Sequence, residues 1–251
     1  MISWIIAAYN EEERLPKTLG RVIDELNTMD FEIIVSDDGS KDGTCDVAST
    51  YANTIDNVRI VTNTHKGQGS AFRHGFNTSK GDVTVFTAAD IWLPRDRVEK
   101  LMMLLDDFDL ILLSKHTHGS IGFNVGTTRR FLSLSFNFLV RLLWKLPYRD
   151  TQGSKICKVS ALKEIISQAK SDGFLFGLEI VVYAHKMNRK IVELPWAYSY
   201  SAGSKVNLRS ILQMIWGLLF LKVRSLGIRG NSTVRRREPL LHWPSASSQW
   251  H

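Results

Sequence analysis

Four clusters of polar residues follow short apolar runs, and their residue types suit the binding of a phosphorylated ligand. They are Ala8-Tyr9-Asn10-Glu11, Asp37-Asp38, the stretch from Asn63 to Gln68, and Asp90. A glycine-containing loop such as Lys66-Gly67-Gln68-Gly69 ahead of a helix can cradle a phosphate, although alone it is more often a turn. A carboxylate can hold a hard cation on such a phosphate. The chemistry open to these residues is therefore the binding of a phosphate-bearing ligand, with or without a metal.

The elements that would position these clusters alternate between strand and helix. We expect strands over 3–7, 31–36, 58–62, 83–87 and 110–114, and helices over 15–26, 42–52, 67–78 and 95–105. This alternation predicts an α/β fold with a mostly parallel, twisted sheet flanked by helices, of the Rossmann-like kind. Ligands of such sheets bind at the carboxyl ends of the strands, where the polar clusters fall.

The second half of the chain is less regular and ends in a basic region. Helices are expected over 128–144, 178–187 and 208–226, and a strand over 191–196. We divide the chain into an α/β domain over 1–206, an amphipathic helix over 207–228 and a basic, flexible tail over 229–251. The division follows the change of composition near residue 227 to Gly, Ser, Pro and Arg.

The net charge of +7 in 251 residues is unevenly placed. Residues 1–193 carry 24 basic and 24 acidic side chains, whereas residues 194–251 carry eight basic ones and the single acid Glu238. A neutral body argues against a protein that wraps nucleic acid. The basic end predicts an anionic partner instead.

Membrane spans and metal or disulfide frameworks are not predicted. The longest apolar run, Met214 to Leu221, is less than half of the roughly 20 residues that a span needs. Cys45 and Cys157 form no framework, which fits a reducing compartment. The histidines show no metal spacing, and His116 and His118 are left unassigned.

Three segments resemble the family 2 glycosyltransferases, which have a nucleotide-sugar-binding fold of the GT-A type. They are Ile5-Ile6-Ala7-Ala8-Tyr9-Asn10-Glu11-Glu12, Ile34-Val35-Ser36-Asp37-Asp38-Gly39-Ser40-Lys41-Asp42-Gly43-Thr44 and Asn63-Thr64-His65-Lys66-Gly67-Gln68-Gly69-Ser70-Ala71. Arg149-Asp150-Thr151-Gln152-Gly153-Ser154-Lys155, Phe176-Gly177-Leu178-Glu179 and Gly203-Ser204-Lys205-Val206 are similar to segments of the polyprenyl-phosphate branch. The likeness spans roughly residues 1 to 225.

The resemblance implies an inverting transferase that moves a hexose from UDP-glucose or GDP-mannose to a polyprenyl phosphate of the dolichyl type. Such an acceptor is already anionic near neutral pH, since its second pKa is about 6, so no general base is needed. The protein must hold two repelling anions together, which calls for a divalent cation, Mg²⁺ or Mn²⁺, and for Arg or Lys side chains. It would be peripheral, on the cytoplasmic side of a membrane.

The resemblance also assigns site residues. The nucleotide-sugar-binding set is Ala8, Tyr9, Glu11, Asp37, Asp38, Lys66, Gly67, Gln68 and Ala89. For Asp37 and Asp38 the alternative is an Asx turn with a helix cap, but the agreement of the flanking motifs favours binding. The acceptor-side set is Ser114, Lys115, Asp150, Gln152 and Glu179, and the catalytic set is Asp90, Arg129, Arg130 and Lys205. For each basic residue taken singly, ordinary surface charge is the alternative.

Two positions depart from the family. Ala88 stands where the first carboxylate of the Asp-X-Asp segment is usual, so that Asp90 alone is the predicted metal ligand. Gly177 stands where an acid is usual, and Glu179 beside it could simply face solvent. The expectation of a metal is weakened accordingly. These losses keep two other functions open: a family 2 enzyme with a glycan or protein acceptor, and a catalytically silent, membrane-docked nucleotide-sugar-binding module.

The helix over 208–226 has a broad apolar face with Trp216 and Phe220. Packing into the core is the commoner fate of such a helix. Its basic neighbours favour an interfacial helix on an anionic membrane surface, and the helix over 128–144 could contribute to the same surface.

Overall fold

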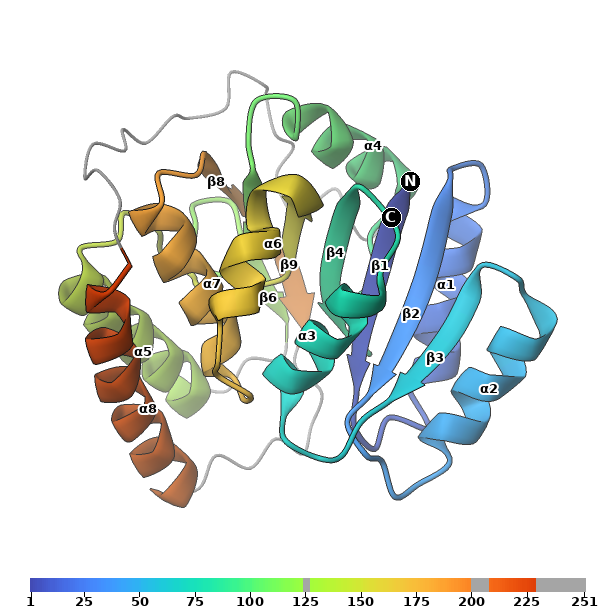
Figure 1. The fold of residues 1–251 in the computed structure, drawn as a ribbon, viewed down its shortest axis with the longest axis horizontal. Helices are drawn as coiled ribbons and strands as arrows, with labels where there is room; N and C mark the ends of the chain where they lie inside the picture. The colour runs from blue at the N-terminus through green and yellow to red at the C-terminus, as the bar shows by residue number, and fades with distance from the viewer. Residues whose placement is uncertain (124–126, 200–207, 229–251) are drawn as a thin grey trace. The chain divides into compact units, whose positions relative to one another are not determined.

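The computed structural model describes residues 1–123, 127–199 and 208–228 (Figure 1). The chain forms two compact units. Unit 1 is Met1–Asp109 with Ser154–Phe176, and unit 2 is Leu110–Gly153 with Gly177–His251. The predicted division at residues 206 and 228 stays a prediction, and the tail over 229–251 lies outside the described residues.

The sheet of unit 1 confirms the predicted α/β fold. Its strands are β1 (Ile2–Ala8), β2 (Phe31–Asp37), β3 (Val58–Thr62), β4 (Val83–Ala88) and β7 (Lys155–Lys158), in the order β3-β2-β1-β4-β7. The first four are parallel, and β7 runs antiparallel to β4. Every residue of β1 and β2 is buried, as expected for parallel strands that are covered on both faces.

Helices cover both faces of this sheet (Figure 1). They are α1 (Leu15–Leu26), α2 (Thr44–Thr54), α3 (Gln68–Thr78), α4 (Arg95–Leu104) and α6 (Val159–Gln168). Because β1, β2 and β3 follow one another in one direction and β4 returns to the other side of β1, right-handed crossovers place α1 and α2 on one face and α3 on the other. The Ser36 hydroxyl of β2 donates to the Ala71 carbonyl of α3 over 2.7 Å, which fixes α3 on the sheet.

Unit 2 combines two pairs of parallel strands with long helices. Its elements are β5 (Leu110–Ser114), β6 (Ile121–Phe123), α5 (Thr127–Trp144), most of α7 (Leu175–Lys186), β8 (Ile191–Pro195), β9 (Ala197–Ser199) and α8 (Leu208–Leu226). Strand β5 pairs with β8, and β6 pairs with β9. Helices α5 and α8 lie side by side (Figure 1), joined by a 2.9 Å hydrogen bond from Trp144 Nε1 to the Ser225 hydroxyl.

The predicted elements are observed with shifts of a few residues at their ends, the largest being α7, which begins three residues early. Strands β6, β7 and β9 and helix α6 were not predicted. Within the described part of the chain, no helix is both long and apolar enough to cross a membrane.

Candidate functional site

The carboxyl ends of β1, β2, β3 and β4 meet at one edge of the unit 1 sheet. Ala8 of β1 is in register with Asp37 of β2, and Asp37 is in register with Thr62 of β3. On the other side of β1, Ala7 is in register with Ala88 of β4. The residues predicted from the nucleotide-site segments are therefore brought to a common edge, which the sequence pattern alone could anticipate.

Asp37 organises the turn that follows β2. It is buried, and its Oδ2 accepts hydrogen bonds from the backbone N–H groups of Gly39 (2.9 Å) and Ser40 (3.0 Å). Its Oδ1 accepts a hydrogen bond from the Ser40 hydroxyl. These contacts are those of the Asx-turn alternative. They leave further lone pairs on the carboxylate, so the predicted nucleotide contact stays a prediction.

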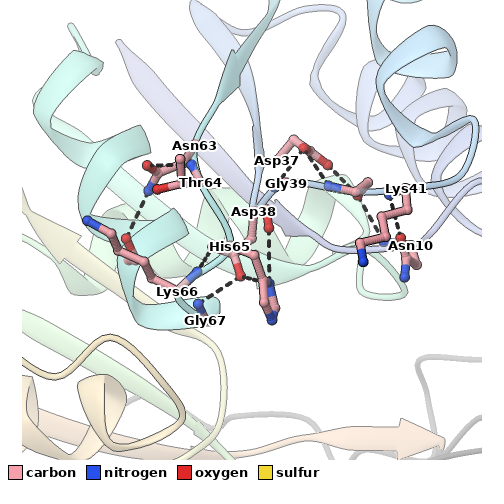
Figure 2. A network of polar contacts seen from close by, with 12 residues as sticks. Asn10, Asp37, Asp38, Gly39, Lys41, Asn63, Thr64, His65, Lys66 and Gly67 are labelled. Atoms are coloured by element: carbon pink, nitrogen blue, oxygen red, sulfur yellow. Dashed lines mark hydrogen bonds and ion pairs between the residues drawn. The ribbon is translucent and has the colours of Figure 1, made fainter.

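Asp38 holds the glycine-containing loop that precedes α3 (Figure 2). Its Oδ1 accepts the Lys66 N–H over 3.0 Å, and its Oδ2 accepts the Gly67 N–H over 2.8 Å. Gly67 has φ +123°, and a Cβ there would lie 2.7 Å from the Asp172 carbonyl oxygen. The loop thus needs glycine at this position, and a buried carboxylate fixes its backbone at the start of a helix.

The loop after β1 is tied to the turn after β2. Asn10, at φ +55°, accepts the Lys41 N–H through its side-chain oxygen (2.9 Å) and donates its own N–H to the Ser40 hydroxyl (2.9 Å). The Glu11 N–H donates to the Thr44 hydroxyl over 2.8 Å. Glu12 accepts the Gly43 N–H over 2.9 Å, which adds a further link between the two loops.

Glu11 and Asp90 are close enough to interact electrostatically. Burial raises the pKa of Glu11, the Arg14 guanidinium 3.2 Å away opposes that rise, and the carboxylates of Asp90 and Asp42 add to it. Asp90 follows β4 and is exposed. Two predicted site residues from different loops therefore repel each other at this edge, which a cation would relieve.

A complete metal site is not preformed among the described residues. No group of three or more His, Cys, Asp or Glu there could hold a metal ion. Ala88 ends β4 and contributes only a methyl group where the family usually has a carboxylate. The chain's own donor is Asp90, with Glu11 near it. This set fits Mg²⁺ or Mn²⁺ only if a diphosphate and water supply the other ligands.

A stacked aromatic pair at this edge was not predicted. The rings of Tyr9 and His65 are 4.1 Å apart between centroids and inclined by 23°. His65 Nδ1 lies 2.8 Å from Asp38 Oδ2 (Figure 2). His65 lies inside one of the segments that resemble the family, but only its neighbours Lys66 and Gly67 were assigned to the nucleotide-sugar site.

Most of the predicted acceptor-side residues gather in unit 2. Ser114 ends β5 and accepts the N–H groups of the two residues at 116 and 117, both over 3.1 Å. Asp150 accepts the N–H of Lys115 (2.9 Å) and that of Gln152 (2.8 Å). The Gln152 side-chain Nε2 is buried and has no hydrogen-bond partner among the described residues. A buried polar group of this kind, without a partner in that part of the chain, is uncommon in folded proteins.

Glu193 of β8 is a further acid that supports this cluster and was not predicted. Its carboxylate accepts the N–H groups of Arg149 (2.8 Å) and Asp150 (2.7 Å). Two buried carboxylates therefore hold the backbone of the Asp-Thr-Gln segment: that of Asp150 within the segment and that of Glu193 from β8. Isolated acids of this kind carry no spacing signal in the sequence.

The structure gives contacts for His116 but less detail for the basic residues of the catalytic set. His116 Nε2 lies 2.9 Å from the Ser133 hydroxyl of α5, and burial lowers the pKa of His116 while Asp150 opposes that shift. Arg130 is exposed in the first turn of α5. Arg129 is placed by its position in α5 alone, and Lys205 lies outside the described residues.

The solvent-facing alternative for Glu179 is wrong. Glu179 is fully buried in α7, where its Oε1 accepts the Tyr183 hydroxyl over 2.9 Å and lies 3.4 Å from Arg224 Nη2 of α8. Leu178, next to it in α7, is also fully buried. The acceptor-side role of Glu179 stays a prediction.

Known sequences and structures resemble this chain over most of its length. The profile of Glycosyl transferase family 2 matches residues 3–172. Dolichyl-phosphate beta-glucosyltransferase of Mus musculus is 32% identical over 246 residues, which covers 90% of this chain and 76% of the mouse protein. Dolichyl-phosphate beta-glucosyltransferase ALG5D of Trichomonas vaginalis is 28% identical over 240 residues, covering 88% and 73%.

Solved structures share the fold. Glucosyl-3-phosphoglycerate synthase of Mycobacterium tuberculosis, in complex with Mn²⁺, UDP and glucosyl-3-phosphoglycerate, has a TM-score of 0.64 at 17% identity and covers 99% of this chain and 91% of its own. Residues 1–349 of TarS from S. aureus give 0.59 at 18% identity, with coverage of 92% and 67%.

Proposed function

Because the chain belongs to glycosyl transferase family 2, we propose that it transfers a hexose, in the first place glucose from UDP-glucose, to a polyprenyl phosphate of the dolichyl type. The similarity to dolichyl-phosphate beta-glucosyltransferases along 88–90% of the chain carries this proposal. GDP-mannose is the alternative donor. The Asp-Thr-Gln segment around Asp150 and the loop at Asp38 lie within that similarity.

In the proposed reaction, a phosphate oxygen of the acceptor attacks the anomeric carbon with inversion. The new bond is from that carbon to the phosphate oxygen, and the bond that breaks is from the carbon to the diphosphate, which leaves with the electron pair. The nucleophile is already ionised near neutral pH. A carboxylate base is unnecessary, which suits Gly177 where the family usually has an acid.

On the donor side, unit 1 would hold the nucleotide. Asp38 sets the Lys66-Gly67 backbone ahead of α3, where a helix N-terminus favours the negative charge of a diphosphate. Asp90, with Glu11 near it, would hold the divalent cation, which neutralises the departing diphosphate when bound. The M. tuberculosis synthase, whose structure is a complex with Mn²⁺ and UDP, supports a cation for the fold in general.

On the acceptor side, unit 2 offers donors and cations. Lys115 and Gln152 lie on a backbone that Asp150 fixes, and the Gln152 Nε2 has no hydrogen-bond partner within the described ranges. Arg130 adds an exposed guanidinium from α5. Arg129 and Lys205 complete the proposed set. Their common role would be to screen the charge of the acceptor phosphate.

Unit 2 also carries the surface that we assign to the membrane. We define the two-helix apolar face as the exposed large side chains of α5 and α8: Phe131, Leu134, Phe138, Leu139, Leu142, Trp216, Leu219, Phe220, Val223 and Leu226. The two helices lie side by side (Figure 1). An aromatic-rich apolar face of this size on an otherwise polar surface suits the headgroup and acyl boundary of a membrane, on its cytoplasmic side.

Two basic residues of α8 that were expected to face an anionic surface make contacts inside unit 2 instead. Lys222 donates to the Leu143 carbonyl of α5, and Arg224 pairs with Glu179. Both therefore serve contacts within unit 2. Arg141 near the end of α5 and Lys145, which directly follows α5, are exposed cations, and these would meet anionic headgroups.

The test is transfer of radiolabelled sugar from UDP-glucose and GDP-mannose to dolichyl phosphate in vesicles, with Mg²⁺ or Mn²⁺. We expect a dolichyl-phosphate-linked product, and a strong loss of it in Asp90→Asn. Transfer only to a soluble glycan or protein would indicate the other acceptor class. Nucleotide binding without transfer to any acceptor would indicate a silent module and would refute the proposal.

A further inference from the structure

We propose that His65 is a positioning residue for the nucleobase of the donor: Asp38 orients its imidazole, which holds the Tyr9 ring, and the base stacks on the resulting aromatic pair. The inference rests on the proposed function, because it assumes a nucleotide ligand. The stack lies at the edge of the unit 1 sheet where the loops of the candidate site meet.

The position of the His65 ring is fixed on two sides. Its face lies against the Tyr9 ring, with centroids 4.1 Å apart and planes 23° from parallel. Its Nδ1 lies 2.8 Å from Asp38 Oδ2 and 3.1 Å from the Asp38 carbonyl oxygen. A ring held by both stacking and a charged hydrogen-bond partner has little freedom to tilt. The Tyr9 ring is thereby held as well.

The stack retains open surface. The His65 side chain is 55% exposed and Tyr9 is 38% exposed. A histidine that served packing alone would be covered by its neighbours, whereas this pair presents flat aromatic area at a ligand edge. Bases stack on aromatic side chains whatever their identity, since every base has a π-face. The chemistry of the surface therefore fits a planar heterocycle.

One carboxylate couples this surface to the loop proposed for the diphosphate. Asp38 Oδ2 contacts His65 and also accepts the Gly67 N–H, while Oδ1 accepts the Lys66 N–H (Figure 2). The base platform and the phosphate loop are thus oriented by the same group. This arrangement would set the spacing between the base and the diphosphate before the ligand arrives.

The experiment compares UDP with inorganic pyrophosphate, which lacks the base, as inhibitors of the full chain and by calorimetry. In His65→Ala we expect UDP to bind about tenfold more weakly, with pyrophosphate unchanged, and KM for the nucleotide sugar to rise while kcat holds. His65→Phe keeps a stacking ring and should recover most of the UDP affinity. His118→Ala, an exposed histidine of unit 2, is the matched control and should behave as wild type.

Each outcome separates this inference from the proposed function. Wild-type protein that binds no nucleotide would refute the proposed function and this inference with it. Wild-type binding of UDP with no loss in His65→Ala would refute the role of His65 alone. Equal losses of UDP and pyrophosphate in both His65 variants would also refute it, because a loop disturbed through Asp38 would affect both ligands.

Discussion

The buried carboxylate of Glu179 in α7 lies 3.4 Å from the guanidinium Nη2 of Arg224 in α8. Glu179 has no exposed surface, and its carboxylate also accepts a hydrogen bond from the Tyr183 hydroxyl. Burial and the Glu179 charge together raise the pKa of Tyr183 to about 12, so the phenol stays protonated and donates. The pair therefore joins the proposed membrane helix to the body of unit 2, reinforced by Lys186, which donates to the Ser225 carbonyl.

Removal of Arg224 should destabilise the protein more than removal of both charges. Arg224→Gln removes a positive charge from beside a fully buried carboxylate, which costs about 3 kcal/mol, at the lower end of the range for broken buried pairs because Arg224 is a third exposed. Glu179→Gln with Arg224→Gln removes the carboxylate charge as well. Urea unfolding of both single variants and the double variant measures the coupling. Additive losses would contradict a direct interaction.

Replacement of Asp90 should lower the pKa of Glu11. Burial raises that pKa and Asp90 contributes further through charge repulsion, so Asp90→Asn removes one of its causes. NMR titration of the Glu11 side-chain carboxyl would follow the change, and Asp42→Asn should shift it in the same direction. A Glu11 pKa that is identical in wild type and Asp90→Asn would place the two carboxylates apart.

His116 and His185 should make the protein less stable in mild acid. Burial lowers the pKa of both below about 6.5, their ordinary value, so the unfolded chain binds more protons between the lowered and the ordinary pKa. The free energy of unfolding should hold above that window and fall as pH drops through it. His116→Gln should flatten this slope between about pH 7.5 and 5.5 in urea titrations, and adding His185→Gln should flatten it further. An unchanged slope would refute the assignment.

Much of unit 1 could be predicted because local signals and tertiary demands agree there. The fully buried strands β1 and β2 are rich in apolar residues, and the stripe Leu15, Leu19, Val22 and Leu26 fixes α1. Strands β6, β7 and β9 escaped prediction because three or four residues carry no readable period. Helix α6 carries a helical spacing of buried apolar residues, Ala161, Leu162, Ile165 and Ile166, so its sequence does contain a signal for a helix.

The candidate site was predictable in its location but not in its contacts. Asp37 and Asp38 carry strand-end signals, and the structure shows that both carboxylates also shape loops. Glu193 and His65 act through residues distant in sequence, so no spacing reveals them. The burial of Glu179 depends on the docking of α8, which a helical pattern in α7 does not specify.

The two-helix apolar face should bind vesicles through its aromatic side chains. Phe138→Ser with Phe220→Ser removes one exposed ring from each helix, and loss of that apolar area should weaken binding to anionic vesicles by about tenfold or more. Flotation with fluorescent vesicles would measure it. Met103→Ser, a comparably exposed apolar residue of unit 1, is the control. Equal binding by all three proteins would remove the membrane assignment of this face.

Gly67→Ala should weaken nucleotide binding through the loop ahead of α3. At φ +123° an alanine is strained, by about 1–3 kcal/mol for such backbone conformations, and its Cβ would lie 2.7 Å from the Asp172 carbonyl oxygen. The loop must shift, which breaks the hydrogen bond from the Gly67 N–H to Asp38. We expect a lower midpoint of thermal unfolding. We also expect UDP to bind more weakly to the folded protein. Gly173→Ala, where a Cβ would meet nothing within 4 Å, is the matched control and should leave both unchanged. Wild-type UDP affinity in Gly67→Ala would show that this loop does not contact the nucleotide.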